Sequence, residues 1–275
     1  MSQKDKIIGI IGLGLIGGSL ALKLIEQNYK VYGFVRDLNS FKTSYKASKS
    51  VSLEIEDKFA KITDRMQELS ECDLVFVCSP LRALVETLKE IQPFLKPGAV
   101  VSDVGSVKSV ICEESKKFFR KDCFFVGGHP MAGTEKSGFA NAFPELFESK
   151  TWALIEDKEM PADKVVFLEE TIQSTGAKVI KTNAQSHDQA VAMISHLPLL
   201  LSLGLLETVN STPDKELKEL ALSLASSGFD GMTRLARGNQ TLNEDLLGLN
   251  FEQVKKCYQD FSERSEELLK EYSLD

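Results

Sequence analysis

Short apolar runs alternate with amphipathic segments from residue 1 to about residue 182. Uninterrupted apolar runs of strand length predict buried strands, whereas apolar residues that recur every three or four positions predict helices. The predicted strands are Lys6–Ile11, Lys30–Val35, Leu74–Cys78, Ala99–Ser102, Phe124–Val126, Trp152–Ile155 and Ala177–Ile180. The helices predicted between them include Ser19–Gln27, Arg82–Ile91 and Asp163–Ser174. This alternation is typical of one doubly wound α/β domain.

The pattern changes after Asn183, where the strand signals stop. Helical spacing of apolar residues then continues to the end of the chain. The predicted helices are Ser186–Asn210, Asp214–Ser226, Met232–Arg237, Asn243–Leu247 and Phe251–Tyr272. The sequence therefore predicts an α/β domain over residues 1–182 and an all-helical domain over residues 183–275. The cleft between two such domains is a natural place for a substrate.

The longest apolar stretch of the chain, Ala190–Leu206, lies in the helical domain. It is interrupted by Ser195, His196, Pro198, Ser202 and Gly204. It is also shorter than the ~20 residues that a membrane span needs, so we expect a buried helix and no membrane partner. A helix that is apolar on most sides needs cover from several directions, which a second copy of the chain can supply. We therefore expect a homodimer.

Composition and charge favour a cytoplasmic enzyme. The 275 residues are 43% hydrophobic, which is enough for two cores of ordinary size. A net charge of −7 offers no basic surface for nucleic acid or an acidic membrane, so we expect neither partner. The N-terminus has no basic segment followed by an apolar one, as an export signal would. The five cysteines are odd in number and form no Cys-x-x-Cys pair, which predicts reduced thiols and neither a disulfide framework nor a metal site.

A glycine-rich turn follows the first predicted strand directly. The sequence from Gly12 to Gly17 matches G-x-G-x-x-G and leads into a predicted helix. In this motif Gly12 permits the tight turn, Gly14 lets the backbone approach a pyrophosphate, and Gly17 allows the helix to pack closely on the strand. Leu15 and Ile16 lie within this motif and are expected to bind the cofactor with the three glycines, just before a helix whose N-terminus attracts an anion. Strand, turn and helix together predict a Rossmann-type dinucleotide site, with a plain tight turn as the alternative.

The second predicted strand, Lys30–Val35, ends beside the position whose side chain contacts the adenosine ribose in such folds. Chains that bind NAD usually place Asp or Glu there, to accept hydrogen bonds from the 2′-hydroxyl. Here the strand is followed by Arg36, whose guanidinium can pair with a 2′-phosphate. We therefore expect NADP as the cofactor. Asp37 keeps NAD as the alternative, because a shift of one residue would bring its carboxylate into the acidic position.

Two further strand ends of the first domain should face the same cleft. Cys78, Ser79 and Pro80 close one strand and are expected to line the cofactor site. The next strand ends in Asp103–Lys108, in which Ser106 is the candidate functional residue. The Ser106 hydroxyl can cap the following helix, touch the substrate or orient a histidine, and these roles do not exclude one another.

The most informative segment is Gly127–Gly133, which holds one of only three histidines. It follows the predicted strand Phe124–Val126, so His129 should lie at the carboxyl end of a strand, where open α/β sheets bind ligands. The glycines have no side chains, so the backbone can pass close to a ligand. Pro130 fixes its own φ, which orients the imidazole of His129 in one direction. Imidazole is the side chain best suited to accept a proton near neutral pH. We expect His129 to be the general base, with a histidine in a surface turn as the alternative.

The long helix predicted at Ser186–Asn210 carries the other two histidines. His187 and His196 are nine positions apart, which is about 180° on an unbroken helix, so only one of them can face a ligand. His187 lies near the start of the helix, where capping is a sufficient explanation. We expect Ser195 and His196 to bind substrate, with a hydrogen-bonded core histidine as the alternative.

Two arginines follow in the helical domain. Arg234 and Arg237 lie three positions apart on a predicted helical face and can bind carboxylates. The alternative for Arg234 is a surface ion pair with Asp230 at i,i+4, which contributes only ~0.3–0.5 kcal/mol. Spacing alone leaves the two possibilities open.

Together, these segments resemble the prephenate/arogenate dehydrogenase family of tyrosine biosynthesis. The resemblance runs over nearly the whole chain. It rests on Gly12–Leu20, Asp103–Lys108, Gly128–Gly133, His187-Asp188, Ser195–Pro198, Ser227–Phe229 and Thr233-Arg234. The glycine motif occurs in many dehydrogenases, whereas the other segments in this order are specific.

The resemblance implies an oxidative decarboxylation, in which a hydride passes from the hydroxyl-bearing ring carbon to the nicotinamide while CO2 is lost and the ring becomes aromatic. It implies that His129 takes the proton of that hydroxyl, that Ser106 assists, and that Arg234 binds a substrate carboxylate. It also implies dimerisation through the helical domain. Relatives that use prephenate often carry a second histidine after His-Leu-Pro, where this chain has Leu199, as in the arogenate-using, NADP-linked branch. We therefore expect arogenate as the substrate, with prephenate as the alternative.

Two other functions fit the same two-domain plan. A β-hydroxyacid dehydrogenase of the 6-phosphogluconate type would need a lysine near the start of the long helix, where His187-Asp188-Gln189 supplies none. A non-catalytic NADP-sensing protein would bind NADPH without turnover. It gives no reason for His129 or Arg234.

Overall fold

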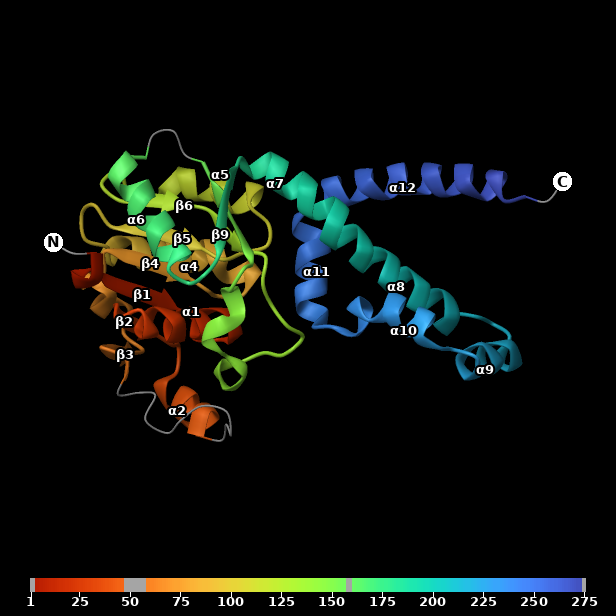
Figure 1. The fold of residues 1–275 in the computed structure, drawn as a ribbon, viewed down its shortest axis with the longest axis horizontal. Coiled ribbons are helices and arrows are strands. Elements are labelled where there is room, and N and C mark those ends of the chain that lie inside the picture. The colour runs from red at the N-terminus through yellow and green to blue at the C-terminus, as the bar shows by residue number, and fades with distance from the viewer. Residues whose placement is uncertain (1–2, 47–57, 157–159, 274–275) are drawn as a thin grey trace. The chain divides into compact units, whose positions relative to one another are not determined.

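The computed structural model describes residues 3–46, 58–156 and 160–273 (Figure 1). The chain divides into two compact units, Met1–Ala184 and Gln185–Asp275. The strands lie in the first unit, and the second is built of helices. The predicted fold class, a Rossmann-type α/β domain followed by an all-α domain, is confirmed.

A parallel six-stranded sheet forms the centre of the first unit. Its strands are β1 (Ile7–Ile11), β2 (Lys30–Phe34), β3 (Lys61–Thr63), β4 (Leu74–Val77), β5 (Val100–Asp103) and β6 (Phe124–Val126). They lie in the order β3-β2-β1-β4-β5-β6, which is that of a dinucleotide-binding fold. β4 and β5 are buried along their whole length, because a parallel sheet is covered on both faces. The sequence analysis missed β3, which is too short to show a hydrophobic pattern.

The first unit has five described α-helices, of which α1 and α4 contact strands of this sheet. The five helices are α1 (Leu15–Glu26), α2 (Leu38–Lys46), α4 (Leu84–Ile91), α5 (Ser109–Phe118) and α6 (Ala162–Gln173). On α1 the side chains of Leu20, Ala21 and Leu24 share one face and are fully buried. A Cβ at Gly18 would lie 2.6 Å from a ring carbon of Phe139, so glycine is needed for this close packing.

A second, three-stranded sheet holds the strands that follow β6. They are β7 (Gly128–Pro130), β8 (Thr151–Ile155) and β9 (Lys178–Thr182), with β7 antiparallel and β9 parallel to β8. The predicted strands thus lie in one unit but in two sheets. Only Gly127 separates β6 from β7, which leaves no room for the crossover that a parallel neighbour needs. Trp152 of β8 contacts Phe76 of β4, with ring centroids 5.9 Å apart, and packs the second sheet against the first.

The second unit consists of helices (Figure 1). They are α7 (Ala184–Val191), α8 (Leu197–Asn210), α9 (Lys215–Ser223), α10 (Ser227–Thr233), α11 (Gln240–Leu249) and α12 (Phe251–Glu271). A π-helical turn at Ala192–His196 joins α7 to α8, so the predicted long helix is present but irregular. A 3₁₀ turn at Leu235–Arg237 follows α10.

The helix from Ala184 to Asn210 is long enough to cross a membrane, and an 18-residue window within it has a mean hydropathy of 1.7. Only 28% of its apolar window is buried within the chain, whereas the sequence analysis predicted a buried helix. Three ionisable side chains in its first half are buried instead, because His187, Asp188 and His196 are 4%, 3% and 1% exposed. One such helix is weak evidence for a membrane span, and an exposed apolar helix is equally typical of a subunit interface.

Candidate active site

The glycine-rich loop between β1 and α1 has the shape that the motif requires. Gly12 has a φ of +92°, and a Cβ there would lie 2.8 Å from the carbonyl oxygen of Cys78. A Cβ at Gly17 would lie 2.0 Å from the Gly12 carbonyl oxygen, so only glycine lets α1 start this close to the strand. At Gly14 a Cβ would meet nothing within 4 Å, and no side chain caps the helix that starts at Leu15. The first-turn amides of α1, with Ile16 and Gly17 among them, therefore fit a pyrophosphate.

The end of β4 lies beside this loop. The amide of Cys78 donates to the carbonyl oxygen of Ile11 at 2.7 Å and ties the ends of two strands together. The Ser79 hydroxyl oxygen is shielded from solvent and has no hydrogen-bond partner among the described residues, which fits a contact with a bound ligand. Burial raises the pKa of the Cys78 thiol, so this side chain stays neutral. Pro80 is exposed and precedes a short 3₁₀ turn.

The two candidate ribose readers follow β2. β2 ends at Phe34, and Arg36 and Asp37 are both exposed. The Asp37 carboxylate accepts hydrogen bonds from the amide of Ser40 at 2.9 Å and from its hydroxyl at 2.7 Å. These bonds lower the pKa of Asp37 and hold the first turn of α2. Asp37 therefore has a local structural role that the sequence analysis did not assign.

His129 lies at the centre of β7 and is 8% exposed. Its strand pairs with β8, where the small side chain of Ala153 stands opposite. The imidazole is therefore held by a sheet, and the alternative of a surface turn is wrong. Ser106 is half-buried on the loop after β5. It is not the cap of α5, because that helix begins at Ser109 with Lys108 as its N-cap.

A buried ion pair joins the loop after β5 to β7. Lys108 donates to the Asp103 carboxylate, and both side chains are fully buried. Lys108 also donates to the carbonyl oxygen of Gly128 at 2.8 Å, and the Gly128 amide donates to Asp103 at 3.1 Å. The sequence analysis noted Asp103 and Lys108 only as part of a motif. An acid and a lysine at the end of a strand are a weak signal, because their burial is not visible in the sequence.

A second buried polar cluster surrounds His196 in the helical unit. Nδ1 of His187 lies 2.8 Å from the Asp188 carboxylate. The Asn250 side-chain amide donates to the Asp188 carbonyl oxygen at 2.8 Å and lies 3.1 Å from Nδ1 of His196. An amide nitrogen only donates, so Nδ1 of His196 is the acceptor and carries no proton. Burial lowers the pKa of His196 to about 4, and the neighbouring Asp188 only partly opposes this shift.

The π-helical turn overturns the predicted geometry of the two histidines. A π turn holds one more residue than an α turn, which rotates the following residues by about 100°. His187 and His196 therefore do not point to opposite sides, and both are buried around Asp188. Ser195, expected beside His196, is half-buried on the same turn. The sequence analysis missed Asn250, whose position between two predicted helices suggests only a cap.

The two arginines of the helical unit have different surroundings. Arg234 follows the last residue of α10 and is exposed. Arg237 lies in the next 3₁₀ turn, where it donates to Asp230 and to Thr233, each at 3.1 Å. Arg234 thus lies at the junction of α10 and the 3₁₀ turn, with helical dihedral angles of −57° and −44°. The Asp230 partner is Arg237, so the predicted alternative of an Asp230–Arg234 pair is not formed.

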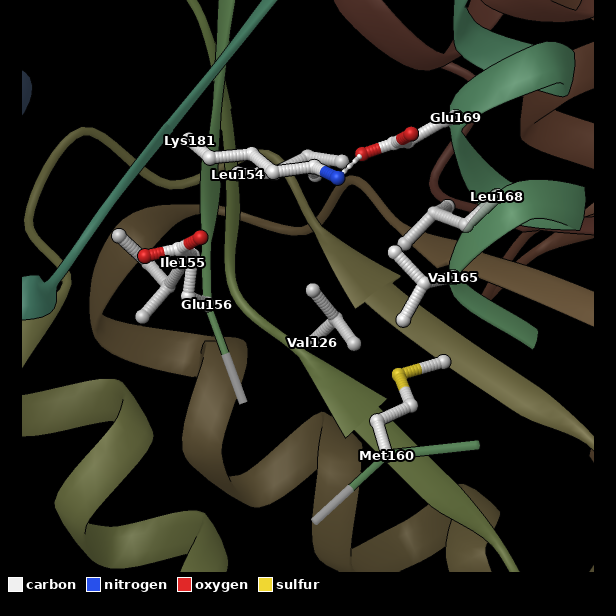
Figure 2. A pocket seen from close by; sticks show the side chains of 9 residues that line it. All are labelled: Val126, Leu154, Ile155, Glu156, Met160, Val165, Leu168, Glu169 and Lys181. Carbon is white, nitrogen blue, oxygen red and sulfur yellow. Dashed lines mark ion pairs between the residues drawn. The ribbon is translucent and has the colours of Figure 1, made fainter. Parts of the chain in front are cut away.

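A separate apolar cavity of about 200 Å³ lies in the first unit (Figure 2). Apolar side chains from β6, β8 and α6 form its walls, and the Glu169–Lys181 ion pair lies at its edge. None of the predicted site residues lines it. The cavity is therefore not part of the candidate active site.

Comparison with known proteins decides the family. The prephenate dehydrogenase nucleotide-binding domain matches residues 20–181, and the prephenate dehydrogenase dimerization domain matches residues 183–272. The chain belongs to the prephenate dehydrogenase family. The predicted resemblance is confirmed, and the chain is an oxidoreductase of the prephenate/arogenate dehydrogenase type.

Individual members of the family differ in their named substrate. The chain is 32% identical to a prephenate dehydrogenase of Lactococcus lactis subsp. cremoris, over 96% of this chain and 70% of that protein. It is similar to the crystal structure of Synechocystis arogenate dehydrogenase, with a TM-score of 0.82 and 30% identity over 96% of this chain and 91% of the other. It is also similar to the crystal structure of Aquifex aeolicus prephenate dehydrogenase in complex with hydroxyphenyl propionate and NAD+. The TM-score is 0.84, and the identity is 28% over 97% of this chain and 90% of the other.

Proposed function

We propose that this chain converts arogenate to tyrosine by oxidative decarboxylation, with NADP as the hydride acceptor. The proposal rests above all on His129, a buried imidazole held in a sheet. In this family's reaction a ring hydroxyl must lose a proton while the neighbouring hydride departs. A fixed imidazole is suited to that task. The alternative is the same reaction on prephenate, which gives 4-hydroxyphenylpyruvate.

We assign proton transfer and substrate binding to different residues of this chain. The bound cofactor supplies the hydride acceptor for the ring carbon that carries the hydroxyl. His129 accepts the hydroxyl proton and, after the ring carboxylate has left as CO2 and its bonding electrons have made the ring aromatic, returns it to the phenolate oxygen. Ser106 assists by hydrogen bonding, and Arg234 binds a substrate carboxylate. Ser195, His196 and Arg237 are proposed to contact the remaining polar groups of the substrate.

The preference for NADP is proposed from the end of β2. Arg36 is exposed there, while the carboxylate of Asp37 is engaged by Ser40. A guanidinium pairs well with a 2′-phosphate. We expect Arg36→Ala to weaken NADP binding by about 10-fold or more and to leave NAD binding unchanged, as measured by fluorescence titration. Lys30→Ala, at the exposed opposite end of β2, is the control and should change neither affinity.

The preference for arogenate is proposed from Leu199. The two substrates differ only at the side chain, an ammonium in arogenate and a ketone in prephenate. A histidine at this position can donate a hydrogen bond to a keto acid, and leucine cannot. Losing one buried polar contact costs ~1–3 kcal/mol, which corresponds to a preference of about 10- to 100-fold.

Initial rates with arogenate and prephenate, each paired with NADP and NAD, test the whole proposal. We expect the highest kcat/KM for arogenate with NADP. Leu199→His should narrow the gap between the substrates, and because Leu199 is 4% exposed the variant needs a circular dichroism check of its fold. If the wild-type kcat/KM is equal for the two substrates or higher for prephenate, the arogenate preference is wrong and the prephenate reaction takes its place. Turnover of neither substrate would refute the function itself.

We also propose that the chain forms a homodimer through its helical unit. The matched dimerization domain spans residues 183–272. Large apolar side chains of this unit are exposed in the single chain, among them Ile194 at 68% and Leu269 at 72%. A second copy of the chain is the partner that would cover them.

A further inference from the structure

Gly128, the residue before His129, has both of its backbone hydrogen-bonding groups engaged by two side chains, one from the last residue of β5 and one from the end of the loop that follows it. Its amide donates to Asp103 at 3.1 Å, and its carbonyl oxygen accepts from Lys108 at 2.8 Å. The carbonyl group belongs to the peptide that links Gly128 to His129. Asp103 and Lys108 therefore fix the peptide groups on both sides of Gly128, and one of these groups carries the backbone of His129.

The arrangement of β7 explains why side chains take this place. Alternate residues of an antiparallel strand direct their hydrogen-bonding groups to opposite edges. The Gly127 carbonyl and the Met131 amide each bond toward β8 at 2.8 Å, so Gly128 faces the other edge. A Cβ at Gly128 would lie 2.7 Å from the Asp103 carbonyl oxygen. Only glycine therefore lets β7 approach the end of β5 this closely at residue 128.

Stability alone does not account for the charged pair. Apolar residues of similar volume usually stabilise a core at least as well as a buried ion pair, because two charges must lose their water. Asp103 and Lys108 are nevertheless fully buried. Besides contacting each other, they bond to backbone groups, Asp103 to the Gly105 amide at 2.8 Å and both residues to Gly128. Their hydrogen bonds are therefore directed at the placement of the backbone.

We propose that Asp103 and Lys108 are positioning residues for His129. They hold the Gly128 peptides and so set the position and direction of the imidazole. The kinetic consequence rests on the function proposed above for His129, whereas the placement itself is measurable without turnover. Misplacing a reacting group by about 1 Å can cost roughly 10² in rate, so a small backbone shift is sufficient to be seen.

The test uses a variant that removes both charges together, because either single change leaves an unpaired buried charge. Asp103→Asn/Lys108→Met keeps the side-chain lengths similar, removes the donor to Gly128 and weakens the acceptor. A partly exposed counterpart, which serves as the control, exists at the start of β1, where Asp73 accepts from the Ile7 amide at 2.9 Å and pairs with Lys6 at 3.2 Å and with Lys96 at 2.9 Å. Asp73→Asn/Lys6→Met removes the same groups from a strand that does not carry His129. Circular dichroism verifies the fold of both double variants.

Nuclear magnetic resonance of the three imidazoles measures the placement directly. The His129 signal is identified by its loss in His129→Asn. We expect it to move or broaden in Asp103→Asn/Lys108→Met and to stay in place in the control. We also expect kcat to fall by about 10- to 100-fold with the cofactor KM changed by less than about 2-fold.

A double-mutant comparison separates positioning from a general loss of structure. If the pair acts through His129, adding Asp103→Asn/Lys108→Met to His129→Asn should lower kcat by less than about 2-fold further. An unmoved His129 signal in the folded variant would overturn the proposal. An equal loss of kcat with and without His129 would do the same. A wild-type chain that turns over neither substrate refutes the proposed function instead, and the magnetic resonance result still decides the positioning role.

Discussion

At residue 129 the proton acceptor can be removed while a hydrogen-bonding side chain is kept. Asparagine donates and accepts hydrogen bonds but does not take up a proton near neutral pH. We expect His129→Asn to retain the fold and cofactor binding and to lower kcat by about 10²–10⁴. The wild-type rate should rise with pH over the range in which imidazole loses its proton, because the base must be neutral, and the variant should lack this rise. Steady-state kinetics over about pH 5.5–9 measure both, and an unchanged profile in the variant would exclude His129 as the base.

Single residues were predictable where their partners are close in sequence. Gly12, Gly14 and Gly17 act within one strand–turn–helix segment, so the need for glycine at these positions can be inferred from the local sequence. The bonds of Asp37 to Ser40 are equally local, and a cap three residues before a serine is a recognisable pattern that the sequence analysis did not use. The contacts of Lys108 with Gly128 span 20 positions, and only the folded sheet brings these two residues together.

At the scale of elements, hydrophobic periodicity located the main strands and helices but not their irregularities. β7 spans only Gly128–Pro130, which is too short for an alternating pattern, and a glycine-histidine-proline segment has little strand propensity. The π-helical turn is equally hidden, because one extra residue per turn does not disrupt an apolar stretch. Both irregular elements carry candidate site residues. The sequence therefore named these residues as candidates, but it could not give their mutual directions.

The contact between the π-helical turn and the start of α12 should be sensitive to acid. In the folded chain the pKa of His196 is about 4, below the ordinary value of 6.5, so the unfolded chain binds its proton first as the pH falls. The contribution of His196 to the free energy of unfolding is fully present above about pH 6.5. It decreases as the pH falls toward 4 and does not change further below that pH. Between about pH 7.5 and 5 the loss amounts to roughly 2 kcal/mol.

Hydrogen exchange measured on peptides from Ala192–His196 and from the first turns of α12 tests this prediction. After correction for intrinsic exchange, protection should fall by about 30-fold over that pH interval, which is 2 kcal/mol expressed as an equilibrium constant. His196→Gln should abolish most of the pH dependence, because glutamine does not titrate. His129→Asn, which alters a histidine of the other unit, should keep it. A wild-type protection that is flat with pH would show that His196 is not held neutral by burial.

At the scale of the whole molecule, the two units differ in how completely they bury their apolar side chains. The first unit buries the central strands of its six-stranded sheet and the inner face of α1, as expected for strands that are covered on both faces. The second unit keeps large apolar side chains in solvent on α9, α12 and the π-helical turn, and at Leu224, the C-cap of α9, which is 72% exposed. Exposed apolar surface on this scale marks an interface, not a finished core. The unit is therefore expected to complete its core with a second copy.

Sedimentation velocity tests the expected dimer. The wild type should sediment with twice the chain mass of 30.5 kDa at micromolar concentration. Ile194→Lys and Leu269→Lys place a charge on side chains that are 68% and 72% exposed in the single chain, so the monomer tolerates them, whereas a buried interface does not. Both variants should shift the distribution toward the monomer. The control is Val166→Lys on α6, where the side chain is 47% exposed in the nucleotide-binding unit and the dimer should persist. A wild type that sediments as a monomer would refute the expected dimer. If both lysine variants remain dimeric, the interface does not include Ile194 or Leu269.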